Sequence, residues 1–370
     1  MKITTVAWQG FAIPFRQPYV TSDTSATIRY GLFLFLHTDT GLTGVGEASP
    51  VGVGTRREVE GIGRAIAGWA TELLGREPTW PLAWSSLTAS PVSSVVRFGI
   101  ETAVLDIQGK AHQCSLAEML GGTAHPLPVN WLIAAETVEE AVSEAKEAVA
   151  LGFTSLKLKV AVGSIEHDLA LVASVREAVG TMVKLRIDPN QGWSVSEAIE
   201  AIRRLAPYGL EYMEQPVAAK DILGLREVRR AVSVPIAADE ALGSANDMRK
   251  LLAADAADLF ILKAGRLGGL DMAQAVMRLA ADAAKPVVVT SSLESGVGIA
   301  ASAHLASLLT SHPFAHGLAT GSLLESDLLS QPLEPTEGVL NIPHGPGLGV
   351  VVDEEALERY SIDVKGNISS

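Results

Sequence analysis

The sequence has few of the residues that would place it in a specialised class of protein. Its 370 residues include a single cysteine, Cys114, so an internal disulfide cannot form and a reducing cytoplasm is the expected compartment. No uninterrupted apolar run approaches the roughly 18–20 residues of a membrane span. Residues 1–6 are typical of a strand and lack the pattern of a signal peptide. We therefore expect a cytoplasmic protein without a membrane partner.

Positive charge is scarce as well. Lysine and arginine total 29 against 42 aspartates and glutamates, which gives a formal net charge of −13. Proteins that bind nucleic acids present basic faces to the phosphates, so we expect no nucleic-acid partner. Apolar residues make up 48% and charged residues 19% of the chain, as in globular proteins with a sizeable core.

The first part of the chain has the pattern of an α+β module. Short apolar runs between turn residues predict antiparallel strands at 3–8, 11–14 and within 30–46, with a polar stretch at 16–25. Apolar residues at helical spacing predict helices at 56–74, 81–89, 95–112 and 116–120. The turn-rich stretch at 121–128 then marks the expected end of this module.

The pattern changes after residue 128. From there to about residue 330, eight short apolar runs alternate with helical segments, which predicts a parallel sheet. Eight such units in about 190 residues favour a closed barrel over an open sheet. The tail returns to turn-rich β chemistry and is expected to pack on the first module. We therefore expect a capping domain at 1–125, a barrel at 126–328 and a segment at 329–370 that completes the capping domain.

Two lysines lie inside the apolar run 156–160. Lys157 and Lys159 are two residues apart, so in a strand both ammonium groups project from the same face. Buried lysines are rare, because removing an ammonium from water costs several kcal/mol unless a partner compensates. Taken alone, this stretch favours a strand end with two solvated lysines over a functional pair.

Charged residues recur at the ends of the following predicted strands. Asp188, Glu214, Asp239 and Lys263 follow Lys159 at steps of 29, 26, 25 and 24 residues. In a parallel barrel, the active site forms at the carboxyl ends of the strands. We therefore expect these side chains to converge with the residues that end the last two strands, Ser291, Ser292 and Thr320.

The three carboxylates predict a metal site. Side by side, Asp188, Glu214 and Asp239 would repel one another and their pKa values would rise, which a divalent cation would relieve. Ligands that are all oxygen suit Mg²⁺ or Mn²⁺, and the sequence has no cysteine or histidine at the spacing of a zinc site. The alternative is that each carboxylate forms a separate salt bridge, for example with Arg186 or Arg203.

The lysines would then flank the metal. Lys159 and Lys263 come from opposite sides of the barrel mouth, and lysine is a poor base at its free pKa near 10.4. The neighbouring Lys157 ammonium, the cation and partial burial are expected to lower the pKa of Lys159. The amine could then remove a proton next to a substrate carboxylate, while the metal neutralises the charge that develops there.

These residues resemble a known family. The motifs that carry the resemblance are Lys157-Leu158-Lys159, Asp188-Pro189-Asn190, Glu214-Gln215-Pro216, Asp239-Glu240 and Ile261-Leu262-Lys263. Together they are similar to those of the muconate-lactonizing subgroup of the enolase superfamily. The resemblance implies an α/β fold, a (β/α)7β TIM-like barrel with an α+β capping domain built from both ends of the chain.

The same resemblance implies Mg²⁺, with Mn²⁺ as a substitute, bound by Asp188, Glu214 and Asp239. It also implies that Lys159 and Lys263 act as acid and base on a small carboxylate substrate. The mandelate-racemase subgroup is disfavoured, because it would carry a His–Asp dyad where this chain has Lys263 and Ser291. A homo-oligomer is compatible with the sequence.

Within the subgroup, residues 290–295 and 316–324 resemble o-succinylbenzoate synthases, which dehydrate 2-succinyl-6-hydroxy-2,4-cyclohexadiene-1-carboxylate in menaquinone biosynthesis. Dipeptide epimerases tend to carry Asp-x-Asp at the eighth strand to hold a substrate ammonium, whereas this chain has Leu318-Ala319-Thr320. The substrate contacts that we expect are Lys157, Asn190, Ser291, Ser292, Thr320 and Gly321.

Three alternatives stay open at this point. A racemase of N-succinylamino acids or a dipeptide epimerase would use the same two lysines, one on each face of the substrate. A muconate-type cycloisomerase is the next alternative. A metal-binding barrel without catalysis belongs to a different class, and the intact lysines argue against it. In each enzyme, the loops at 17–25 and 49–55 would close over the substrate.

Overall fold

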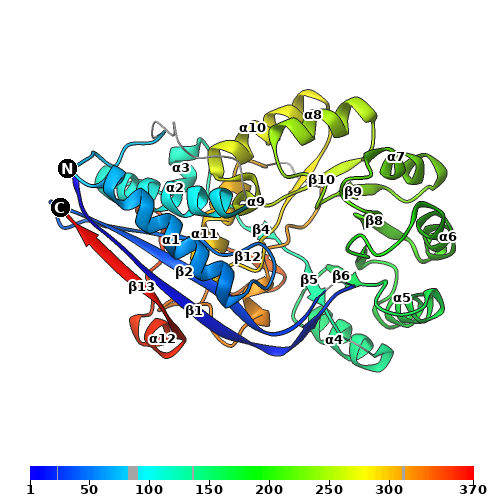
Figure 1. Ribbon diagram of the computed structural model, residues 1–370. Helices are drawn as coiled ribbons and strands as arrows, with labels where there is room; N and C mark the ends of the chain where they lie inside the picture. Colours follow the sequence, from blue (N-terminus) through cyan, green and yellow to red (C-terminus); the bar gives the residue numbers. More distant parts are fainter. Residues whose placement is uncertain (23, 82–90, 136, 311–312) are drawn as a thin grey trace.

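The computed structural model describes residues 1–22, 24–81, 91–135, 137–310 and 313–370. Figure 1 shows two parts of the molecule. One is an elongated antiparallel sheet with its helices, and the other is a curled parallel sheet surrounded by helices. The helix that the sequence predicts at 81–89 falls almost entirely outside the described residues. Within the described ranges, every helix is too short or too polar to cross a membrane.

The antiparallel sheet joins the two ends of the chain. Its strand order is β13-β1-β2-β3, and β13 brings the tail back beside β1, as expected. These strands are β1 (Ile3–Val20), β2 (Ser25–Thr38), β3 (Thr43–Glu47) and β13 (Ser361–Ser369).

The first two strands form one long hairpin. Pairing runs from Ile3 opposite Thr38 to Val20 opposite Ser25. The prediction of two short strands followed by a loop from residue 16 is therefore wrong, and β1 continues through the polar segment. The register shifts between Pro14 and Tyr19 and pairing with β2 resumes at Tyr19 and Val20, because ladder hydrogen bonds join backbone groups and form regardless of side-chain polarity.

Helices cover one face of this sheet. They are α1 (Arg56–Leu73) and α2 (Pro91–His112), and the short α3 (Leu116–Leu120) that follows packs against α2 and the barrel helix at Gly296–Ala306. Two glycines of β3 allow α2 to lie directly on the strand. A Cβ atom added at Gly44 would lie 2.1 Å from the carbonyl oxygen of Ala103. One added at Gly46 would lie 1.9 Å from the carbonyl oxygen of Gly99. Side chains at these two positions would therefore force the helix away from the sheet.

The parallel sheet contains seven strands in the order β11-β10-β9-β8-β7-β6-β5. They are β5 (Trp131–Ile133), β6 (Ser155–Lys159), β7 (Lys184–Asp188), β8 (Leu210–Glu214), β9 (Ile236–Ala238), β10 (Leu259–Leu262) and β11 (Val287–Val289). An eighth extended segment closes the ring, since His316 bridges to Val129 before β5 and Gly317 bridges to Thr290 after β11.

A helix follows each of the seven strands. These helices are α4 (Val138–Ala150), α5 (Ile165–Val179), α6 (Val195–Leu205), α7 (Ile222–Ala231), α8 (Ala245–Ala254), α10 (Leu270–Asp282) and α11 (Gly296–Ala306). The predicted (β/α)7β barrel is confirmed. The remaining elements are α9 (Ala264–Leu267), α12 (Glu354–Arg359), a 3-10 turn η1 (Ala206–Tyr208), a second one η2 (Thr320–Leu323), and the strand pair β4 (Leu127–Pro128) and β12 (Val339–Leu340).

Two buried glutamates fasten the capping sheet and its helices to the barrel. Glu101 of α2 accepts hydrogen bonds from the backbone N–H of Leu270 (2.8 Å) and Asp271 (3.0 Å) at the start of α10. Glu47 of β3 does the same for Ser295 and Gly298 at the start of α11, both at 2.9 Å. The first N–H groups of a helix lack partners within the helix and favour negative charge, so each contact satisfies donors of the barrel with a carboxylate from the cap.

Candidate active site

A pocket of about 390 Å³ lies between the carboxyl ends of the barrel strands and the capping loops. Capping segments around Tyr19–Thr24 and Val51–Thr55 contribute to its wall, which is where the loops expected to cover a substrate should lie. Several of the predicted site residues line it, namely Lys157, Lys159, Asn190, Glu214, Lys263, Ser291, Ser292 and Thr320. Asp188 and Asp239 contact the pocket lysines from outside the lining: Asp188 forms an ion pair with Lys159, and Asp239 forms one with Lys263. Gly321 follows Thr320 in η2 and does not line the pocket.

The lysine pair of β6 binds carboxylates of the next two strands. The Nζ of Lys157 lies 2.8 Å from Asp188 Oδ2 and 2.6 Å from Glu214 Oε1. The Nζ of Lys159 lies 2.7 Å from Asp188 Oδ2 and donates to Asn190 Oδ1 at 2.6 Å. The even spacing therefore places both lysines on the inner face of the barrel, as predicted, and neither is a solvated strand end.

These ion pairs determine the protonation of the lysines. Burial alone would lower the pKa of Lys159, but the charge of Asp188 outweighs it and raises that pKa above its ordinary value. The carboxylate that would serve the metal stabilises the ammonium here, and the expected lowering of the Lys159 pKa, which includes a nearby cation among its causes, stays a prediction. Burial would likewise raise the pKa of Asp188, but Lys157 and Lys159 together hold it below its usual range.

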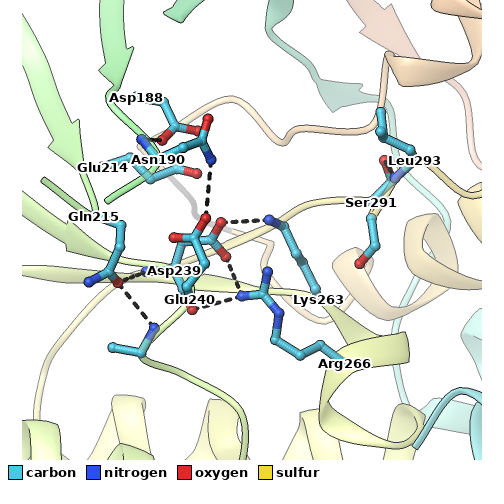
Figure 2. A network of polar contacts seen from close by, with 12 residues as sticks. Asp188, Asn190, Glu214, Gln215, Asp239, Glu240, Lys263, Arg266, Ser291 and Leu293 are labelled. Carbon is cyan, nitrogen blue, oxygen red and sulfur yellow. Dashed lines mark hydrogen bonds and ion pairs between the residues drawn. The ribbon is translucent and has the colours of Figure 1, made fainter. Parts of the chain in front are cut away.

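The opposite side of the mouth is built around Asp239, which directly follows β9. Lys263 Nζ lies 2.6 Å from Asp239 Oδ2, and Arg266 Nη1 lies 2.7 Å from Asp239 Oδ1 (Figure 2). Gln215 fixes the backbone here, because its Oε1 accepts from the N–H of Asp239 (3.0 Å) and of Ala241 (3.1 Å). One carboxylate thus holds two cationic side chains in place.

Two buried carboxylate oxygens at the centre of the site have no hydrogen-bond partner among the described residues. They are Glu214 Oε2 and Glu240 Oε2. Burial, followed by the charge of Asp188, raises the pKa of Glu214 to about 8. An unpartnered carboxylate oxygen in a buried site is costly, and a cation is the partner that would satisfy it.

The donor set fits a hard divalent cation. Asp188, Glu214 and Asp239 come from three adjacent strands and offer only oxygen, the preference of Mg²⁺ and Mn²⁺. Within the described ranges, no group of three or more acidic, histidine or cysteine side chains is arranged closely enough to hold a metal ion. The ammonium of Lys157 instead lies against Asp188 and Glu214 and neutralises the pair that a cation would bridge.

The wall formed after the last two strands is neutral. Ser291 Oγ and Thr320 Oγ1 share a hydrogen bond of 2.5 Å. The hydroxyls of Thr290 and Ser292 are buried without a hydrogen-bond partner among the described residues. Leu293 adds an apolar contact to this wall, which lies across the site from Asp188 in Figure 2.

Sequence reasoning missed several residues of the site. Arg266 is one of them, and the signal that could have found it is its place three residues after Lys263. Glu240 was only part of a motif, yet it accepts a hydrogen bond from Asn190 Nδ2 at 3.1 Å. Arg186 does not bind the site carboxylates, since its Nε donates to Glu211 at 2.6 Å. Arg186 is therefore not the salt-bridge partner that the alternative named, and the three carboxylates instead bind cations of the site itself, namely Lys157, Lys159, Lys263 and Arg266.

Two family models match the chain. One, described as the mandelate racemase / muconate lactonizing enzyme N-terminal domain, matches residues 3–121. The other, described as the enolase C-terminal domain-like family, matches residues 140–356. Together they cover both the capping sheet and the barrel.

Individual relatives differ in their reactions. An o-succinylbenzoate synthase of Thermobifida fusca is 44% identical over 64% of this chain and 71% of its own length. An L-Ala-D/L-Glu epimerase of Bacillus subtilis is 30% identical over 95% of this chain and 97% of its own. A dipeptide epimerase of Cytophaga hutchinsonii, solved with Mg and the dipeptide D-Ala-L-Val, superposes with a TM-score of 0.89 at 27% identity, covering 100% of this chain and 99% of its own.

Proposed function

The chain belongs to the muconate-lactonizing subgroup of the enolase superfamily, and from this premise we propose that it is an o-succinylbenzoate synthase. The proposed reaction is the syn elimination of water from 2-succinyl-6-hydroxy-2,4-cyclohexadiene-1-carboxylate, a step of menaquinone biosynthesis. The observation that carries this choice is the neutral wall of Ser291, Ser292 and Thr320 after the last two strands. A wall of hydroxyls suits a substrate without an α-ammonium group, and the identity to the Thermobifida fusca synthase supports the same choice.

We assign the metal site to Asp188, Glu214 and Asp239, with Mg²⁺ as the natural cation and Mn²⁺ as a substitute. When bound, the cation supplies positive charge that stabilises the enediolate form of the substrate carboxylate. A cation held by Asp188 would remove from Lys159 the partner that raises its pKa, and would thereby favour the amine form of Lys159.

The proton movements follow from the two lysines. The Lys159 amine takes the α-proton, and the electron pair of the C–H bond moves toward the carboxylate. The Lys159 ammonium then returns its proton to the departing hydroxide, so water leaves and the ring becomes aromatic. Lys263 remains an ammonium on the other side and stabilises negative charge. Lys157 and Asn190 are the proposed neighbours of the substrate carboxylate.

The second candidate is a racemase of N-succinylamino acids. The observation that favours it is that Lys159 and Lys263 lie on opposite sides of the mouth, as a two-base reaction requires. The epimerase relatives make a dipeptide substrate the next possibility to test. Muconate-type cycloisomerisation and a barrel without catalysis complete the set of alternatives.

Incubation in deuterated water separates these functions. The purified protein with Mg²⁺ would be given the cyclohexadiene carboxylate, an N-succinylamino acid, a dipeptide and muconate in separate reactions. We expect rapid formation of the aromatic product and little deuterium at the α-carbon of the amino acid or dipeptide. Deuterium uptake with loss of optical activity, and no aromatic product, would instead establish the racemase or epimerase.

Removal of divalent cations tests the metal assignment. We expect chelation to abolish turnover and added Mg²⁺ or Mn²⁺ to restore it, because the buried charge of three carboxylates needs a cation. Zn²⁺ should restore less, since the site offers only oxygen ligands. Full turnover after exhaustive chelation would contradict this assignment.

A further inference from the structure

Arg29 is a buried cation that the proposed reaction does not use. It lies in β2, is 0% exposed, and points its guanidinium at three main-chain carbonyls. Its Nε donates to Leu293 O at 2.6 Å and its Nη2 to Pro50 O at 2.8 Å. Its Nη1 donates to Gly52 O. Each of the three nitrogens of this side chain therefore donates to a backbone acceptor.

These carbonyls belong to two different walls of the pocket. Pro50 and Gly52 lie in the capping loop between β3 and α1, whose residues Val51 and Val53 line the pocket. Leu293 lies in the barrel loop after β11 and lines the pocket from the other side. A single side chain therefore fixes the distance between a wall from the cap and a wall from the barrel.

The barrel loop holds its backbone in a conformation that needs support. Leu293 has φ +66°, in the left-handed region that a γ-branched side chain rarely adopts. Such a conformation persists only when surrounding contacts hold it, and the bond from Arg29 to Leu293 O is one of them. In the capping loop, Gly52 (φ +78°) and Gly54 (φ +71°) adopt the same region without strain.

The type of residue at this position is informative. A buried guanidinium is costly, and burial does lower the pKa of Arg29, although the charges of Glu47 and Glu294 act against it. Apolar side chains would hold two loops together at a smaller cost. Arginine offers instead a rigid planar fork whose donors meet several acceptors at fixed relative positions.

We propose that Arg29 is a positioning residue that sets the width of the pocket between Leu293 and the loop 50–54, and thereby the length of substrate side chain that fits. The inference rests on the proposed function only where it is tested with substrates. It predicts that Arg29 governs discrimination between substrates and has little influence on proton abstraction at Lys159, which binds its own partners on the far side of the mouth.

Three variants test this inference. Arg29→Lys keeps the positive charge near Glu47 and Glu294 but cannot reach three acceptors, so the variant should fold and lose the fixed spacing of the two loops. Arg29→Met removes both the charge and the hydrogen bonds to the loops. Arg97→Met is the matched control, because Arg97 also ties the cap to the barrel, at Asp271 (2.6 Å), but away from the residues that line the pocket.

The first readout is steady-state kinetics with the succinyl substrate and an analogue whose side chain is one methylene shorter. We expect both Arg29 variants to raise KM for the succinyl substrate by about tenfold and to change kcat by less than about threefold. The preference for the full-length side chain should fall by about tenfold. Unchanged KM and preference in Arg29→Lys, or the same changes in Arg97→Met, would overturn the inference.

The second readout requires no substrate. Hydrogen exchange followed by mass spectrometry should show faster exchange at 50–54 and 291–295 in both Arg29 variants than in wild-type protein and in Arg97→Met. Unchanged exchange in those segments would overturn the inference whatever the reaction. If the wild-type protein turns over neither substrate, the proposed function fails, and the exchange experiment still decides the role of Arg29.

Discussion

Lys159 and Lys263 stand on two sides of the same pocket, and their surroundings differ in one respect. Each binds an aspartate that also binds a second cation: Asp188 holds Lys159 and Lys157, whereas Asp239 holds Lys263 and Arg266. On the Lys159 side the second cation is another lysine. On the Lys263 side it is an arginine, which does not lose its proton in proteins.

This difference divides the two sides chemically. On the Lys159 side both cations are lysines, which can give up a proton, and the amide of Asn190 accepts a hydrogen bond from Lys159. The Lys263 side stays cationic through Arg266, whose pKa the charge of Asp239 raises against the effect of burial. The asymmetry suits a reaction with one lysine as base and the other as a fixed positive charge, and the experiments below test it.

The largest effect is expected from Lys159→Ala. The variant removes the proposed base, and the neighbouring Lys157 is held by Asp188 and Glu214, so kcat for the aromatic product should fall by about 10³-fold or more. The measurement is product formation at saturating Mg²⁺. As a control, Mg²⁺ should still raise the melting temperature of the variant, because the carboxylates remain. Full activity in this variant would contradict the role of Lys159 as base.

A pair of arginine substitutions tests the asymmetry itself. Lys159→Arg and Lys263→Arg both keep a positive charge and both remove a group that can act as a base near neutral pH. We expect Lys159→Arg to be nearly as inactive as Lys159→Ala, and Lys263→Arg to stay within about tenfold to a hundredfold of wild-type kcat. Equal and severe losses in both variants would mean two bases, as in a racemase.

Much of this site could be predicted from the sequence because a barrel repeats its geometry. Each βα unit returns the chain to the same edge, so Asp188, Glu214, Asp239 and Lys263 could be aligned by their spacing alone. The seven parallel strands of the described residues and the family match confirm the repeated βα units on which this alignment depends. The same regularity shows the limit, because spacing locates a side chain and does not say what it binds.

The contacts that the sequence did not reveal join distant segments. Arg29 and Leu293 are 264 residues apart, and Glu101 and Leu270 are 169 apart. No local pattern marks such pairs, since their geometry is decided by how the cap docks on the barrel. The protonation of Lys159 does not follow from the sequence for a related reason, because the partners of its ammonium depend on whether a cation occupies the carboxylates.

The smallest effect on the Lys159 side is expected at Asn190. Its Oδ1 accepts from Lys159 at 2.6 Å and its Nδ2 donates to Glu240 at 3.1 Å, so it orients the base without exchanging a proton. Asn190→Gly removes these contacts and tolerates the backbone angle of φ +44°. We expect kcat to fall by about tenfold, since the variant keeps the lysine itself and loses only the contact that orients it.

Gln191→Gly provides the comparison for this last variant. Gln191 also has a left-handed backbone, at φ +66°, but its side chain accepts from the N–H of Ala219 at 2.8 Å and does not contact Lys159. It therefore reports the effect of loosening the loop alone. If Asn190→Gly lowers kcat no more than Gln191→Gly, Asn190 does not orient Lys159. If it lowers kcat further at an equal melting temperature, the amide is part of what distinguishes the Lys159 side from the Lys263 side.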